Sequence, residues 1–238
     1  VEGIVAIGVQ SAQNNANAYQ SVSIGWQATK DASTFSGAFV GAQSGRGANA
    51  SYAVAVGAES GMFMQGSDGI AIGRLAGRNM TGTASIAIGK DTARVSTANG
   101  HISIGYLAGY SNTSGGSNTN LGYRAGYYNT TGTGRVMIGA EAGFGNTGTR
   151  NVFIGDNTGG GSGSGAYNAV VGTYCLYAVN AGSNNSILGY SAMPTATGSN
   201  NVAVGYQAGD SITTGSNLTM VGYDADASSA TATNEITL

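Results

Sequence analysis

The chain has 238 residues and a formal net charge of −2, with 9 Lys and Arg against 11 Asp and Glu. Charged residues make up only 8%, against about a quarter of an average soluble protein, so charge gives no reason to expect binding to nucleic acid. The sequence has no run of 18 apolar residues, so we expect no membrane insertion, and its single cysteine excludes an intrachain disulfide.

One glycine recurs every 16 or 17 residues along the chain. These structural repeat positions are Gly8, Gly25, Gly41, Gly57, Gly73, Gly89, Gly105, Gly122, Gly139, Gly155, Gly172, Gly189, Gly205 and Gly222. A fixed short period predicts a solenoid, because each repeat can bury apolar side chains only by stacking on its neighbours. We therefore predict an all-β chain of about 14 coils, forming one repeat domain over residues 1–238.

Each repeat glycine follows a short apolar segment, as in Val5-Ala6-Ile7 before Gly8. Two branched residues that flank a third one point to the same side of a strand, because side chains alternate with a period of two. In chain order the predicted strands are 5–7, 22–24, 38–40, 54–56, 70–72, 86–88, 102–104, 119–121, 136–138, 152–154, 169–171, 186–188, 202–204 and 219–221.

The orientation of these strands predicts a partner. We expect the branched first and third residues to face the inside of the coil. The middle residue then faces outward, although it is apolar in most coils, for example Phe39, Met137 and Phe153. A strand that is apolar on both faces is expected to be buried on both, so the sequence predicts packing against another chain.

When the repeats are aligned on this glycine, equivalent residues form columns, and three further columns are informative. Three residues after it, no side chain is larger than Thr, which indicates a close approach of backbone. A glycine often follows at the next position, as in Gly45 and Gly159, and we expect a positive φ both there and at the repeat glycine itself. Four residues before it, Asn151 and Asn168 belong to an asparagine column whose side-chain amides are expected to bond to the amide of the next coil.

The strands resemble the head repeats of YadA-like trimeric autotransporter adhesins, most closely in Asn201-Val202-Ala203-Val204-Gly205. This resemblance implies a left-handed parallel β-roll and a homotrimer of identical chains. That family has a period of 14 residues, whereas this chain has 16 or 17. The segment 105–115 and the closing segment 232–238 are also similar to tail-fibre proteins of bacterial viruses, in which the closing stretch precedes a self-cleaving chaperone.

These resemblances favour a non-enzymatic fibre segment of a bacteriophage tail, extracellular or on the virion, that contributes to attachment to host surface polysaccharide or protein. The head of a bacterial adhesin on the cell surface is the alternative, and a solenoid enzyme that processes polysaccharides is a second one. We expect no cofactor, metal or catalytic residues. The only imidazole, His101, is expected at a surface corner. Cys175 is expected either to substitute for a small residue such as Ala or to be a reactive thiol.

Two groups of side chains are candidates for receptor contact. Aromatic residues follow the repeat glycine and are expected either to bind sugar rings or to cover the trimer seam. Basic residues on adjacent coils need compensating charge, either from partner-chain acids such as Glu59 and Asp91 or from an anionic glycan or phosphate. The candidates are Trp26, Tyr106, Tyr123 and Tyr206 among the aromatic residues, and Arg74, Arg78, Lys90 and Arg94 among the basic ones.

Overall fold

The computed structural model describes residues 3–17, 19–161, 163–177 and 181–238. Within these ranges the chain forms short strands and turns, and no helix. It divides into two compact units, Val1–Ser117 and Asn118–Leu238, which we describe one at a time. The single domain over 1–238 stays a prediction.

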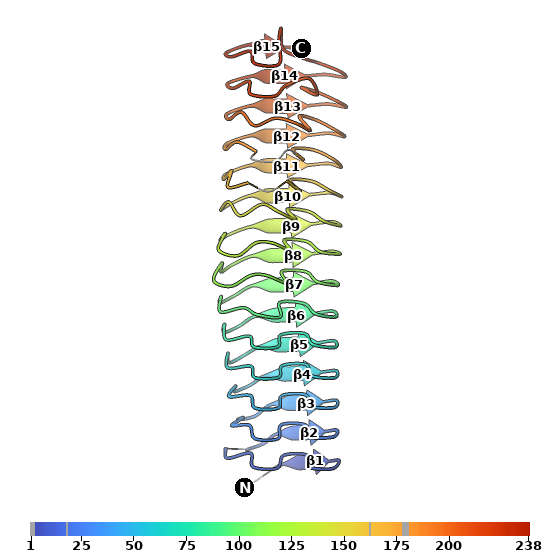
Figure 1. Ribbon diagram of the computed structural model, residues 1–238, viewed down its shortest axis with the longest axis vertical. Helices are drawn as coiled ribbons and strands as arrows, with labels where there is room; N and C mark the ends of the chain where they lie inside the picture. Colours follow the sequence, from blue (N-terminus) through green and yellow to red (C-terminus); the bar gives the residue numbers. More distant parts are fainter. Residues whose placement is uncertain (1–2, 18, 162, 178–180) are drawn as a thin grey trace. The chain divides into compact units, whose positions relative to one another are not determined.

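Each coil of unit 1 contributes one short strand, and successive strands pair in parallel (Figure 1). The register joins equivalent positions of the repeat, for example Ile72 with Ile88. The strands of unit 1 are β1 (Val5–Ile7), β2 (Val22–Ile24), β3 (Ala38–Val40), β4 (Val54–Val56), β5 (Ile70–Ile72), β6 (Ile86–Ile88) and β7 (Ile102–Ile104).

Unit 2 repeats this arrangement with parallel pairs in sequence order. Its strands are β8 (Thr119–Leu121), β9 (Val136–Ile138), β10 (Val152–Ile154), β11 (Ala169–Val171), β12 (Ser186–Leu188), β13 (Val202–Val204), β14 (Thr219–Val221) and β15 (Ile236–Thr237). The bounds of β1–β14 confirm the predicted strands, and β15 is an additional one. The predicted parallel β-solenoid is therefore the fold of the chain.

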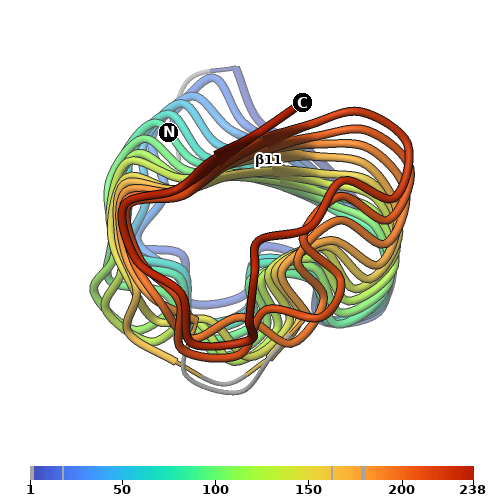
Figure 2. The same cartoon turned by 90° about the horizontal axis from the view of Figure 1, so that it is seen from above.

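In each unit the strands lie along one side of the coil, and turns form the remaining sides (Figure 2). Viewed from above, the chain leaves the strand in the clockwise sense while it rises toward the viewer, so the coils are left-handed as predicted. The coils are joined by backbone hydrogen bonds between equivalent positions, such as the Gly41 N–H donating to the Ile24 carbonyl at 2.8 Å.

The predicted orientation of the strands is wrong. The middle residue of each strand points into the coil and is buried from β2 to β14, as Phe39, Met137 and Phe153 illustrate. The first and third residues face outward, and none of them is buried. Alternation fixes which residues share a face, but it does not say which face is inside when both are apolar.

The inside of the coil is narrow, and this explains the composition of the middle column. In half of the coils the middle residue is Ala or Ser, and the Phe and Met side chains of this column each lie beside a glycine that makes room for them. A Cβ on Gly159 would lie 2.6 Å from the Phe153 ring, and one on Gly45 would overlap the Phe39 ring. Buried apolar side chains of this kind form the core of each unit.

The repeat glycines confirm the prediction of a special backbone conformation. All fourteen have a positive φ, between 122° at Gly8 and 159° at Gly189. A Cβ on Gly41 would lie 2.5 Å from the Gly57 carbonyl oxygen, because the next coil stacks directly on it. The small column three residues later is buried from Ala28 onward. It belongs to a turn whose hydroxyls bond to the next coil, such as Ser44 Oγ to the Ala55 carbonyl at 2.8 Å.

The asparagine column of unit 2 forms a ladder of buried hydrogen bonds with the backbone. The Asn151 Oδ1 accepts from the Asn168 N–H at 2.8 Å, and the Asn168 Oδ1 accepts from the Asn185 N–H at 2.9 Å. Each amide nitrogen donates to a glycine carbonyl, as Asn168 Nδ2 does to Gly182 at 2.9 Å. Arg135 occupies one position of this column and interrupts the ladder.

Candidate functional site

Exposed apolar side chains follow the outward side of the strands in each unit, and we call this surface the outer sheet face. It consists of the first and third residues of each strand, which are mostly Val, Ile and Leu. In unit 1, Val56 and Ile72 are 38% and 37% exposed, and in unit 2 Leu188 is 52% exposed. Rows of branched apolar side chains on a regular sheet are the kind of surface that proteins bury against a partner.

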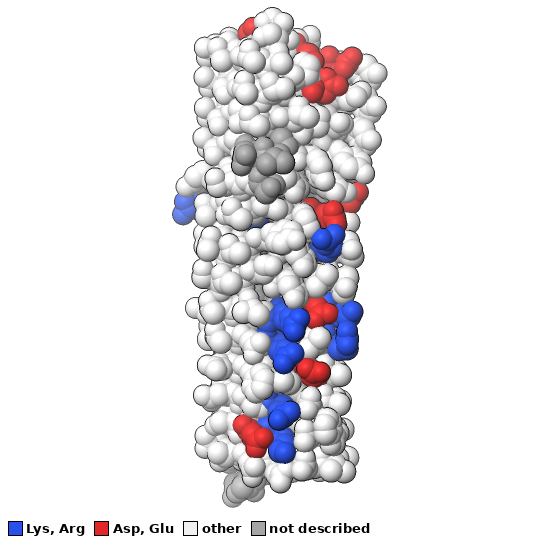
Figure 3. Space-filling model, viewed as in Figure 1, with Lys and Arg blue, Asp and Glu red and all other residues white. Residues whose placement is uncertain are grey.

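The four basic candidates, Arg74, Arg78, Lys90 and Arg94, lie on adjacent coils of unit 1, and we call them the basic group. Basic and acidic side chains alternate on this part of the surface (Figure 3). Partner-chain acids were one of the two expected sources of compensating charge, but Glu59 and Asp91 pair with the basic group within the same chain. Arg78 Nη1 lies 3.5 Å from Glu59 Oε2, and Lys90 Nζ lies 3.8 Å from Asp91 Oδ2.

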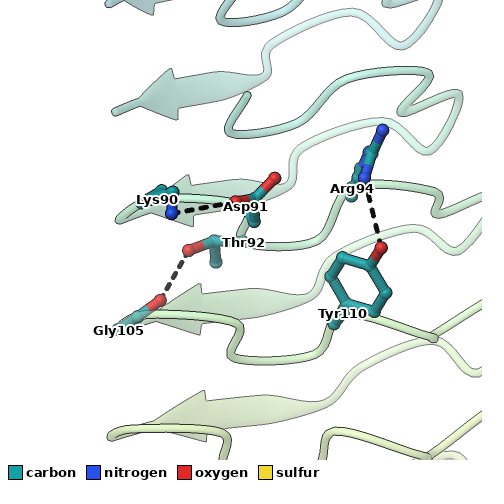
Figure 4. Close-up of polar contacts among 6 residues, drawn as sticks. All are labelled: Lys90, Asp91, Thr92, Arg94, Gly105 and Tyr110. Carbon is teal, nitrogen blue, oxygen red and sulfur yellow. Dashed lines mark hydrogen bonds and ion pairs between the residues drawn. The ribbon is translucent and has the colours of Figure 1, made fainter. Parts of the chain in front are cut away.

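The remaining contacts of the basic group involve aromatic side chains. Arg94 Nη1 donates to the Tyr110 hydroxyl at 3.2 Å (Figure 4), and Lys90 Nζ lies 5.1 Å from the centre of the Tyr106 ring. Arg74 has no ion pair among the described residues. Exposed ion pairs contribute at most about 1 kcal/mol, so the basic group keeps most of its capacity to attract an anion.

The aromatic candidates are exposed, but they differ in how much ring surface they offer. Tyr206 stacks between Tyr190 and Tyr223, with ring centres 5.4 Å apart on both sides and planes within 11° and 5°. Neighbouring rings therefore cover both of its faces, and solvent meets its edge and hydroxyl. Trp26 is 52% exposed in unit 1, whereas Tyr123 lies 5.7 Å from the Arg124 guanidinium in unit 2.

A surface cavity of about 520 Å³ lies in unit 1 and was not predicted from the sequence. It crosses three consecutive coils, just before β2, β3 and β4. The signal for it was present, because amide or hydroxyl side chains recur there with the period of the repeat, beside a pair of aromatic residues. Its lining residues are Ala16, Asn17, Tyr19, Ser33, Phe35, Asn49 and Ser51.

We expected His101 at a surface corner, and this is wrong, because the side chain is fully buried inside unit 1. Its Nδ1 lies 3.2 Å from the Ala98 carbonyl and 3.5 Å from Ser96 Oγ. Burial lowers the pKa of this imidazole, and the Ala98 carbonyl raises it to a smaller extent. Substrate cannot reach the ring without opening the coil, so this histidine is a structural residue.

Two other titratable groups, Cys175 and Asp210, have raised pKa values. Cys175 is buried in the small column, and desolvation raises the pKa of its thiol, which reduces its reactivity. Asp210 lies near Asp224 and Asp226; its pKa is raised mainly by desolvation and then by these two charges. In the described part of the chain, no cluster of three or more His, Cys, Asp or Glu side chains is arranged to hold a metal ion.

No protein-family model matches this chain, and a search of the curated proteins finds no match to it. Among the described residues, no helix has the length and apolar character needed to cross a membrane. The function is therefore inferred from the surfaces described above.

Proposed function

We propose that this chain is a structural and adhesive fibre segment that works as a homotrimer, as in a bacteriophage tail fibre, and contributes to attachment to a host surface. The observation that carries the proposal is the outer sheet face, where apolar side chains recur in every coil. The likeness of the strands to the repeats of trimeric adhesins supports an assembly of three chains, and the likeness of the segments 105–115 and 232–238 to tail-fibre proteins supports the fibre role.

The outer sheet face supports association because of its regularity. Residues such as Ile72 and Ile88 stand side by side at equivalent positions of adjacent strands, so the apolar surface continues from coil to coil within each unit. Full burial of an exposed Val, Ile or Leu side chain contributes roughly 1.5–3 kcal/mol, and side chains that are already about half covered gain about half of that. With two such residues in most coils, several coils together can offset the loss of freedom on association.

Light scattering at neutral pH tests the proposal directly. We expect a mass of three times the 23.5 kDa of the chain. Replacing Ile72 with Lys places a charge in the outer sheet face without disturbing the inside of the coil, and we expect it to weaken the trimer. Val95 is the matched control, because it is 45% exposed but lies outside the strands, so Val95→Lys should remain trimeric.

A wild-type chain that is monomeric at all concentrations would exclude the trimer. If the Ile72 and Val95 variants dissociate equally, the trimer exists but the outer sheet face has no special part in its assembly.

The basic group provides a second contact surface for attachment to anionic groups of a cell envelope. Replacing Arg78 and Arg94 with Gln should weaken binding to host cells and reduce its dependence on salt, because screening acts on the lost charges. Unchanged binding with an unchanged salt dependence would exclude this role of the basic group.

A further inference from the structure

The cavity of unit 1 has two walls that differ in chemistry. One wall carries Asn17, Ser33 and Asn49, which occupy equivalent positions on three successive coils. Asn17 Nδ2 donates to Ser33 Oγ at 2.6 Å, so these side chains are aligned along the coil axis. The side chain of Asn49 is exposed, and its amide offers both donors and an acceptor to a ligand.

The other part of the lining is aromatic. The rings of Tyr19 and Phe35 stack with their centres 5.3 Å apart and their planes within 6°. Tyr52 meets Phe35 edge to face at 5.7 Å and supports it from the next coil. Tyr19 and Phe35 are 37% and 38% exposed, so apolar ring atoms remain accessible beside the polar wall.

Backbone hydrogen bonds hold the aromatic wall in place. Parallel bridges join Tyr19 with Phe35 and Phe35 with Ser51. The Ser36 N–H donates to the Tyr19 carbonyl and the Tyr52 N–H to the Phe35 carbonyl, both at 2.8 Å. The cavity is thus built on the repeat itself, and a preorganised wall loses little freedom when a ligand binds.

None of the lining residues is charged, so the cavity does not select an ion. Apolar ring atoms beside amides and hydroxyls suit a ligand that has both C–H surface and many hydroxyl groups. The volume is in the range of ligand sites, which is about 300–1,000 Å³. We propose that this cavity binds a neutral saccharide, such as a short segment of a surface polysaccharide. The proposal gives a ligand class to the attachment role above, and it rests on that role.

The test uses the whole chain and a glycan array of neutral and acidic bacterial oligosaccharides, followed by calorimetric titration with the strongest neutral binder. We expect a neutral binder to emerge. Phe35→Ala and Asn49→Ala should each lower its affinity about tenfold, which corresponds to the loss of one good contact. Circular dichroism shows whether Phe35→Ala keeps its fold. Asn49→Ala tests the site independently, because its side chain is exposed.

Two controls separate this cavity from the other candidates. Tyr206→Ala removes an exposed aromatic ring of unit 2, and Arg78→Gln with Arg94→Gln removes charge; neither should change the affinity for a neutral sugar. The proposal is overturned if no neutral sugar binds, if only acidic sugars bind, or if the Phe35 and Asn49 variants bind as the wild type does. Light scattering measures the oligomeric state independently, so failure of the saccharide site would not contradict the proposed trimer.

Discussion

Arg135 is the clearest defect in the interior of unit 2, and replacing it with Asn should stabilise the protein. Its side chain is 1% exposed, and its Nε and Nη1 have no hydrogen-bond partner among the described residues. Only Nη2 has a contact, a weak one to Met137 Sδ at 3.4 Å. Arginine also has no acceptor, so it cannot accept a hydrogen bond from the Asn151 N–H as an asparagine would.

The size of the expected gain in stability follows from the buried charge of Arg135 and from the asparagine hydrogen bonds that it interrupts. Burial lowers the pKa of the Arg135 guanidinium from its ordinary value to about 9. Because each tenfold change in a protonation equilibrium is about 1.4 kcal/mol, keeping the charge at neutral pH costs the folded unit roughly 5 kcal/mol. Two restored hydrogen bonds add about 1 kcal/mol each, and the void left by the shorter side chain costs several kcal/mol. We expect Arg135→Asn to gain about 3 kcal/mol.

Thermal unfolding followed by circular dichroism measures this gain. For a chain of this length, about 3 kcal/mol corresponds to a rise of roughly 6–12 °C in Tm. Arg150→Asn is the matched control one coil further, where the arginine is exposed and bonds to the Tyr167 hydroxyl at 2.9 Å. Surface changes of this kind stay within about 0.5 kcal/mol. A Tm of Arg135→Asn at or below that of the wild type would refute the reasoning and indicate that the guanidinium has a counter-ion inside the coil.

Three further predictions concern the repeat and the buried titratable groups. Gly41→Ala should destabilise the fold by on the order of 3 kcal/mol, since its Cβ would meet the Gly57 carbonyl, whereas Gly100→Ala has open space around it and should cost less; equal costs in chemical denaturation would contradict the stacking argument. Burial lowers the pKa of His101 below its ordinary value of 6.5, so as the pH falls the unfolded chain binds a proton at this residue before the folded chain does. The free energy of unfolding should therefore keep its full value above about pH 6.5 and decrease below it, by at most about 1.4 kcal/mol per pH unit. Melting curves of His101→Asn should lose this decrease, and an unchanged pH profile would assign it to other groups. The Cys175 thiol should react with a disulfide reagent at pH 8 only after unfolding, and fast labelling of the native chain would show that the small column opens.

Local chemistry made the repeat predictable. Only glycine fits where each coil ends its strand with a positive φ and the next coil stacks directly above, as at Gly41. The three-residue strands followed from branched apolar residues two apart, and the asparagine ladder followed from a column of equal side chains. All of these features depend on contacts between equivalent positions of neighbouring coils, so the period of the sequence determined them.

The tertiary structure decided what lies inside the coil. Both faces of the strands are apolar, so hydrophobicity could not choose between them; the choice depends on the narrow interior, where a large side chain such as Phe153 fits only beside a glycine such as Gly159. The same closure of the coil buries His101 and Arg135, although their column reads as polar. It also brings Glu59 to Arg78 and assembles the cavity beside Phe35 from three coils. These contacts depend on the path of the chain through the turns of each coil, and the sequence pattern does not contain the resulting distances between side chains.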